Sequence, residues 1–237
     1  MSNIVFITAI EENGPLGLKE PCVNSWKKWC DKNAVQLVLL EQRPDKDISP
    51  HWSRYLALDY LTLQNINFDK VALIDMDTII HPECDNIFEH SSDKLGASID
   101  FDLPWWNKES INHFQQVFPG LELSWDEYIN SGVLVINKSH SELLNSMISF
   151  YKENKGVINL DEGQSGADQT PFNFLVKKLG VEVDILPKRF NLTHLMKKDM
   201  LDDEKFEQTP AIWHFNSLFP KERDNFMKYF AELCEKQ

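Results

Sequence analysis

The sequence predicts an α/β fold with a mostly parallel central sheet and helices on both faces. Apolar segments of strand length alternate with segments of helical periodicity, and neither repeats nor low-complexity tracts interrupt them. The 237 residues are within the reach of one such domain, so we expect a single domain over residues 1–237. Sheets of this kind bind ligands beyond the carboxyl ends of their strands.

The chain up to residue 75 predicts three strands and two helices. Residues 3–10 form a branched apolar run typical of a strand, and residues 21–32 predict a helix with proline near its start. Residues 35–41 predict the second strand. Apolar residues at helical spacing predict a helix over 51–65, followed by a strand over 71–75.

The chain after residue 75 continues the alternation. A capping-box pattern from Ser139 to Glu142 predicts the start of a helix that runs to about residue 153. The other predicted helices are 168–179 and 221–235. The predicted strands are 94–101, 129–137, 181–186 and 211–215.

Bulk composition excludes several classes of protein. The net charge of −13 argues against duplex nucleic acid as a partner, although a local basic pocket for phosphate remains compatible with it. No apolar run has the length of a membrane span, and the N-terminal residues do not resemble a signal peptide. We therefore expect a cytoplasmic protein, in which the sequon at Asn191 is a chance match. Its oligomeric state is unknown from the sequence.

The four cysteines, Cys22, Cys30, Cys84 and Cys234, show no CxxC spacing. Reduced thiols, mostly packed in the interior, are the expectation for such a protein.

The stretch VALIDMDTII places two carboxylates, Asp75 and Asp77, at the end of a predicted buried strand. In an extended chain these two residues point the same way, so their charges repel unless a cation lies between them. Oxygen ligands of this kind suit Mg²⁺ or Mn²⁺. The alternative, from the residues alone, is a solvated turn after a buried strand.

Four other stretches combine polar residues with predicted element ends. They are Asn130-Ser131-Gly132 before an apolar run, Asp168-Gln169 at a helix start, His214 between Trp213 and Phe215, and Arg54 in the helix before the acidic pair. Gly132 would allow a ligand to approach the backbone closely. Each stretch also has a plain structural interpretation: turn chemistry, a helix N-cap, a buried histidine and a surface charge.

Taken together and in this order, these stretches resemble the retaining glycosyltransferases of family 8, which include glycogenin and bacterial lipopolysaccharide galactosyl- and glucosyltransferases. The resemblance extends from the first predicted strand to about Lys221. It implies a GT-A fold, a nucleotide-diphospho-sugar transferase architecture in which Mn²⁺ holds the donor. It assigns Asp75, Asp77 and His214 as the metal ligands, with Mg²⁺ as the less suited ion because an imidazole is among them.

The resemblance also implies roles around the donor. Arg54 and Lys221 would bind phosphate, and Met76 and Gly132 would belong to the donor site. The end of the first strand, Thr8, Ala9 and Ile10, would border the base and ribose. Asn130, Ser131, Asp168 and Gln169 would line the sugar, with Asp168, Gln169 and Asn130 as the catalytic set. The chain departs from the family in having Ser217 at a usual glycine position, no Pro-Trp after Lys221, and Glu11-Glu12-Asn13-Gly14 after the first strand.

A second acidic pair, Asp100 and Asp102, either faces the sugar or lies in a solvated loop. Trp105, Trp106 and Trp125 either line an acceptor cleft, since aromatic faces stack on sugars, or are ordinary packing residues.

The predicted function is therefore metal-dependent transfer of a sugar from a UDP-sugar to a hydroxyl acceptor, such as a carbohydrate, with retention. An inverting reaction would instead need a base such as Asp126 or Glu127. The alternatives are a haloacid-dehalogenase-type phosphatase, with Asp202 and Asp203 as its later acidic pair, and a non-catalytic nucleotide-sugar-binding relative.

Overall fold

A computed structural model describes residues 2–11, 17–101, 103–160, 168–193, 195, 208–216 and 218–235, without the side chains of residues 159 and 160. Several features of the sequence lie outside these residues: residues 12–14, Asp102, the pair Asp202 and Asp203, and Ser217.

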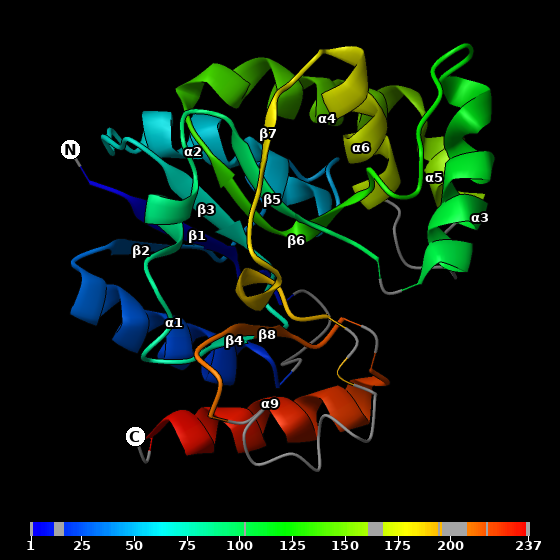
Figure 1. The fold of residues 1–237 in the computed structure, drawn as a ribbon. Coiled ribbons are helices and arrows are strands. Elements are labelled where there is room, and N and C mark those ends of the chain that lie inside the picture. Colours follow the sequence, from blue (N-terminus) through cyan, green and yellow to red (C-terminus); the bar gives the residue numbers. More distant parts are fainter. Residues whose placement is uncertain are drawn as a thin grey trace.

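Six strands form the main sheet, in the order β2-β1-β3-β6-β5-β7 (Figure 1). Five of the six point the same way, and β6 runs antiparallel to both of its neighbours, β3 and β5. The mostly parallel sheet predicted from the sequence is confirmed. The strands are β1 (Ile4–Thr8), β2 (Gln36–Leu40), β3 (Val71–Ile74), β5 (Leu95–Ile99), β6 (Ile129–Ile136) and β7 (Val183–Ile185).

Helices cover both faces of this sheet, as predicted. Figure 1 shows α2, α4 and α6 over one face and α1 over the other. In β1, Ile4 and Phe6 join the core under the first group, while Val5 and Ile7 join the core that includes α1. This alternation is the period-2 pattern of a strand buried on both sides.

The helices are α1 (Lys19–Asn33), α2 (Ala57–Leu63), α3 (Pro104–Phe114), α4 (Ser141–Glu153), α5 (Lys155–Leu160), α6 (Gln169–Lys178) and α9 (Pro220–Glu235). The predicted helix over 51–65 begins with a 3-10 turn, η1 (Trp52–Leu56), before α2. None of the described helices is long and apolar enough to span a lipid bilayer.

The sequence did not predict α3, which begins at Pro104. Its buried residues are Asn107, Ser110, Ile111 and Phe114, at the i, i+3, i+4 and i+7 spacing of a helix face. Two of these four are polar, so hydrophobic periodicity does not reveal the helix.

A second, two-stranded sheet pairs β4 (Thr78–Ile80) with β8 (Ile212–His214). Its residues Ile79 and Trp213 belong to the same core cluster as α1, so the small sheet packs on the main one. β4 has only three residues, which is too short a pattern to predict from the sequence.

All four cysteines, Cys22, Cys30, Cys84 and Cys234, are buried and unpaired. Burial raises the pKa of each thiol to about 12. The expectation of packed, reduced thiols is confirmed.

Candidate functional site

The side chains of Asp75, Asp77 and His214 converge beyond the carboxyl end of β3. The His214 Nε2 atom lies 3.2 Å from Asp77 Oδ1 and 3.9 Å from Asp75 Oδ2. One ligand atom from each residue lies within 4.8 Å of the other two, a spacing at which all three can reach one ion. Residues predicted to share a metal therefore lie close enough to do so.

Helix α1 fixes the position of the turn that contains Asp75 and Asp77. Thr78 Oγ1 donates to the carbonyl of Asp75 (2.8 Å) and accepts from Trp26 Nε1 (2.9 Å). Trp26 is fully buried on α1. The position of the acidic turn is thus set by a helix about 50 residues earlier in the chain.

The small sheet brings His214 to this turn. Thr78 of β4 lies opposite His214 of β8, and the backbone N–H of Phe215 donates to the carbonyl of Asp77 (2.9 Å). Figure 1 shows the β4–β8 pair between the main sheet and α9. Residues more than 130 positions apart thereby become neighbours.

Gly132 lies directly against the His214 ring. A Cβ atom at Gly132 would be 2.2 Å from His214 Cε1 and 3.0 Å from Asp75 Oδ2. The sequence predicted close approach of a ligand at this glycine. In the structure the His214 ring lies against this glycine, and contact of Gly132 with a ligand stays a prediction.

Arg54 forms an ion pair with the acidic turn. Its Nη1 lies 2.5 Å from Asp75 Oδ1, and the residue is 4% exposed. Its Nε and Nη2 are buried and have no hydrogen-bond partner in the described part of the chain. Arg54 therefore compensates the charge of Asp75 and has two further N–H groups without a partner among the described residues.

The pKa values of Asp75, Asp77 and His214 are shifted in different ways. Burial raises the pKa of Asp75 to about 6, although the Arg54 charge opposes the rise. Burial also acts to raise the pKa of Asp77, but the charge and hydrogen bond of His214 outweigh it and hold that pKa below its usual range. Burial alone would lower the pKa of His214, yet Asp77 reverses the effect and raises it. A proton on His214 therefore occupies the space where a divalent ion fits.

Asp168 lies at the N-cap position of α6, but its side chain does not cap the helix. Its Oδ2 accepts a hydrogen bond from the buried Tyr55 hydroxyl (2.8 Å). The plain N-cap interpretation of Asp168 is therefore wrong, and its carboxylate is held by a neighbour of Arg54.

Asp100 joins the polar residues of β6 and α6. Its Oδ2 accepts from Asn130 Nδ2 and from Gln169 Nε2, each at 3.0 Å. Gln169 Oε1 accepts from the backbone N–H of Ser131 (3.0 Å). Asp100 is 5% exposed, so the solvated-loop alternative is wrong for this residue.

Comparison with solved structures identifies the fold. A glycosyltransferase involved in the glycosylation of the major capsid of PBCV-1 superimposes with a TM-score of 0.66, at 10% identity, over 97% of this chain and 100% of that one. The galactosyltransferase LgtC, solved with donor and acceptor sugar analogues, gives 0.58 at 17% identity over 99% and 95% of the two chains. The chain has a GT-A glycosyltransferase fold. The GT-A prediction is thereby confirmed.

A third structure, the glycosyltransferase GlyE of Streptococcus pneumoniae TIGR4, matches with a TM-score of 0.55 at 15% identity, over all of this chain and 63% of that one. No family model matches the sequence, and no curated protein is similar enough in sequence to match. The similarity to these solved structures is therefore one of fold, at 10–17% sequence identity.

In this GT-A fold, the end of β1 lies beside the acidic turn, because Ile7 pairs with Ile74 of β3. Ala9 and Ile10 are buried, and the buried Thr8 hydroxyl has no partner among the described residues. Met76 is partly buried against the core that includes α1. Contacts of Thr8, Ala9 and Ile10 with a base and ribose, and of Met76 with the donor, remain predictions.

The predicted phosphate-binding Lys221 is exposed near the start of α9. Arg223 approaches the site instead, with Nη1 3.7 Å from Asp77 Oδ2. Residues two apart on a helix differ in direction by roughly 200°. Distance from His214 along the chain indicates Lys221, whereas the phase of the helix directs Arg223 towards Asp77.

The predicted acceptor tryptophans differ in their surroundings. Trp105 is 56% exposed at the start of α3. Trp125, Lys108 and Ile111 line a pocket of about 290 Å³. Asp75, Asp77 and His214 are not among the residues that line it. Asp126 and Glu127 are exposed, hydrogen-bonded to Ser124 and to Lys177 respectively. Nothing in these contacts favours either carboxylate as a base for inversion.

Proposed function

We propose that this protein is a metal-dependent glycosyltransferase that moves a sugar from a UDP-sugar to a hydroxyl group of a carbohydrate or similar acceptor, with retention. The observation that supports it most is the convergence of Asp75, Asp77 and His214 beyond the carboxyl end of β3 in a GT-A fold. A cytoplasmic location belongs to the same proposal.

The three side chains fit a divalent ion. Two carboxylates and one imidazole form a donor set that suits Mn²⁺, whereas Mg²⁺ favours oxygen and water. The Asp75 side chain is 36% exposed, so an ion and its ligand can reach it from solvent. When bound, such an ion neutralises the negative charge of a diphosphate.

Cationic side chains surround the space where a diphosphate would lie. Arg54 has two buried N–H groups without partners in the described chain, and Arg223 lies within 3.7 Å of Asp77. Guanidinium groups pair with phosphate through two parallel hydrogen bonds. We assign Arg54 and Arg223 to the phosphates, with Lys221 as a weaker candidate.

The sugar would lie towards α6 and β6. Asn130 and Gln169 are engaged by Asp100, so we assign them to shaping the site. Asp168 is held through one oxygen by Tyr55, and its carboxylate is the better candidate to stabilise positive charge that develops on the sugar. In the proposed retaining reaction the departing phosphate accepts the proton of the attacking hydroxyl.

Two alternatives predict other outcomes. A haloacid-dehalogenase-type phosphatase is not favoured, because the acidic turn follows the third strand of a GT-A fold and a histidine completes the cluster. A non-catalytic relative would bind UDP-sugar and Mn²⁺ without turnover.

The test is UDP release from a panel of UDP-sugars, with Mn²⁺, with Mg²⁺ and with a chelator. We expect Mn²⁺-dependent release that Asp77→Ala abolishes while circular dichroism stays unchanged, because Asp77 is a ligand and not a core residue. Asp31→Ala, an exposed carboxylate on α1, is the matched control and should retain full rate. Full activity of Asp77→Ala would contradict the metal assignment, and hydrolysis of a phosphomonoester with Mg²⁺ alone would support the phosphatase.

A further inference from the structure

A series of hydrogen bonds between buried side chains connects His214 to Asp100. His214 Nδ1 lies 2.9 Å from Asn191 Oδ1, Asn191 Nδ2 donates to Asn130 Oδ1 (2.8 Å), and Asn130 Nδ2 donates to Asp100 Oδ2 (3.0 Å). All four residues are at most 5% exposed. In the sequence Asn191 appeared only as part of a chance glycosylation motif.

The backbone N–H of Gly132 determines the direction of every hydrogen bond in this series. The N–H of Gly132 donates to Asn130 Oδ1 (2.9 Å), so this atom must be the carbonyl oxygen of the amide. Asn191 therefore presents its NH₂ group to Asn130 and its oxygen to His214. Because that oxygen only accepts, the Nδ1 atom of His214 must hold a hydrogen.

We propose that Asn191 is a positioning residue that keeps the proton of His214 on Nδ1 and leaves Nε2 directed at Asp75 and Asp77. The inference rests on the proposed function in one respect, because it takes Nε2 to be the atom that binds the metal. A histidine ligand needs its other ring nitrogen to donate to a fixed acceptor, since that hydrogen bond selects the tautomer and the ring orientation.

The surrounding backbone holds Asn191 and His214 in register. The N–H of His214 donates to the carbonyl of Leu192 (2.8 Å), and the N–H of Leu192 donates to the carbonyl of Ile212 (2.8 Å). Leu192 also forms a parallel bridge with Trp213. On its other side the ring lies against Gly132, so it has little room to rotate.

The same series of hydrogen bonds connects the proposed metal ligand His214 to the residues expected to line the sugar. Asp100, which ends the chain of amides, also accepts from Gln169, and Gln169 binds the backbone of Ser131. Replacing Asn191 should therefore affect His214 first, with Asn130 and Gln169 affected indirectly.

The tautomer can be measured directly on the metal-free protein. Ring-¹⁵N-labelled histidine and long-range ¹H–¹⁵N correlation spectra identify which ring nitrogens hold a hydrogen. The resonances of His214 are assigned by their absence in His214→Gln. Because Asp77 lies 3.2 Å from Nε2 and competes for a hydrogen there in the metal-free protein, the readout is the hydrogen on Nδ1. We expect Nδ1 to hold a hydrogen in the wild-type protein and to lose it in Asn191→Leu, which leaves the hydrogen on Nε2.

Two further variants separate this role from a general loss of packing. Asn191→Asp keeps the acceptor and should keep the Nδ1-protonated form, even if the fold loses stability. Asn173→Leu removes an equally buried amide that bonds to the backbone of Ile129, and should leave the His214 tautomer unchanged. Titration with Mn²⁺ should show affinity about 10- to 100-fold weaker in Asn191→Leu than in the wild type.

The outcomes distinguish this inference from the proposed function. The absence of a hydrogen on Nδ1 in the wild-type protein, or an unchanged Nδ1 hydrogen in Asn191→Leu, would overturn the role of Asn191. The expected tautomer pattern without Mn²⁺ affinity would leave Asn191 as the positioning residue and contradict the metal-dependent reaction.

Discussion

At the scale of the residue, the site depends on close approach between a side chain and a backbone. The His214 ring occupies the space where any residue other than glycine at position 132 would place its Cβ. The ring is also 3.2 Å from Asp77 and buried. Gly132 is therefore needed because it leaves room for the His214 ring, and not because its backbone angle is unusual.

Gly132→Ala should displace His214, because the new methyl group would overlap the ring. We expect a loss of about 1–3 kcal/mol in the free energy of unfolding, as for other overpacked interiors, together with weaker Mn²⁺ binding. Urea denaturation and Mn²⁺ titration would measure both. Gly156→Ala is the control, since nothing lies within 4 Å of its Cβ position. Unaltered Mn²⁺ affinity in Gly132→Ala would show that His214 is not a ligand.

Affinity for Mn²⁺ should fall as the pH falls. Asp75, with a pKa near 6 in the folded protein, takes up a proton below that pH, and His214, whose pKa is raised, holds a proton that the ion must displace. Because the pKa of Asp75 is higher in the folded than in the unfolded state, its proton stabilises the metal-free fold, and this contribution is lost as the pH rises to about 6. Stabilisation by Mn²⁺ should therefore be larger above that pH. Calorimetric titrations across this range would measure it, and a flat profile would contradict the ligand set.

At the scale of the element, two short strands and two helices assemble the site. β4 and β8 have only three residues each, yet their pairing places His214 opposite Thr78 and thus beside the acidic turn. α1 fixes the same turn through Trp26 and Thr78. α9 then adds Arg223 from the far end of the chain. Elements with little stability of their own are ordered by the core that they share.

The first turns of α9 allow a direct comparison of two cations. Arg223→Gln should raise the KM for a UDP-sugar roughly 10- to 150-fold, because a charge-assisted hydrogen bond to phosphate is worth roughly 1.5–3 kcal/mol. Lys221→Gln, the matched variant two residues earlier, should have a smaller effect. Initial-rate kinetics over a range of donor concentrations would decide between them. A larger effect at Lys221 would support Lys221, the residue that the sequence resemblance indicated, as the main phosphate-binding residue of α9.

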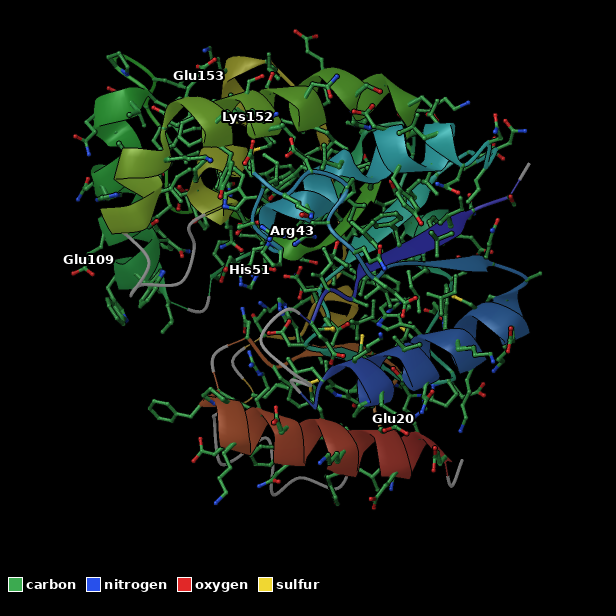
Figure 2. The ribbon with its side chains drawn as sticks, turned by 180° about the vertical axis from the view of Figure 1, so that it is seen from behind. Glu20, Arg43, His51, Glu109, Lys152 and Glu153 are labelled. Atoms are coloured by element: carbon green, nitrogen blue, oxygen red, sulfur yellow. The ribbon has the colours of Figure 1, made fainter. Side chains whose placement is uncertain are left out.

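At the scale of the whole molecule, the two hydrophobic clusters lie on opposite faces of one sheet. β1, β3 and β6 each contribute residues to both clusters, and the small β4–β8 sheet joins the one that includes α1. Figure 2 shows, from behind, that side chains fill the space on both sides of the sheet. The ligands of the proposed metal come from both the main and the small sheet.

Because the two clusters share their strands, we expect one cooperative unfolding transition for residues 1–237. Scanning calorimetry would measure it, and equality of the calorimetric and van't Hoff enthalpies would support a single domain. Saturating Mn²⁺ should shift the whole transition to higher temperature, since a ligand that binds only the folded state stabilises it. Two separate transitions, with only one sensitive to Mn²⁺, would contradict the single-domain prediction.

The sequence by itself determined the features that local pattern encodes. Branched apolar runs defined the strands of the main sheet, and the period-2 placement of Asp75 and Asp77 indicated a metal site. The ordered polar stretches indicated the GT-A fold. Where local pattern was weak, prediction failed: α3 buries Asn107 and Ser110 on its inner face, and β4 is three residues long.

Only the tertiary structure decided which residues act together. Hydrogen bonds between positions far apart in the chain leave no local periodicity, so neither the link from Asn191 to His214 nor that from Tyr55 to Asp168 was visible in the sequence. The burial of Asp100, the contact between Gly132 and the His214 ring, and the approach of Arg223 to Asp77 depend on the same packing. Strand order and helix phase set these distances, and both are properties of the folded chain.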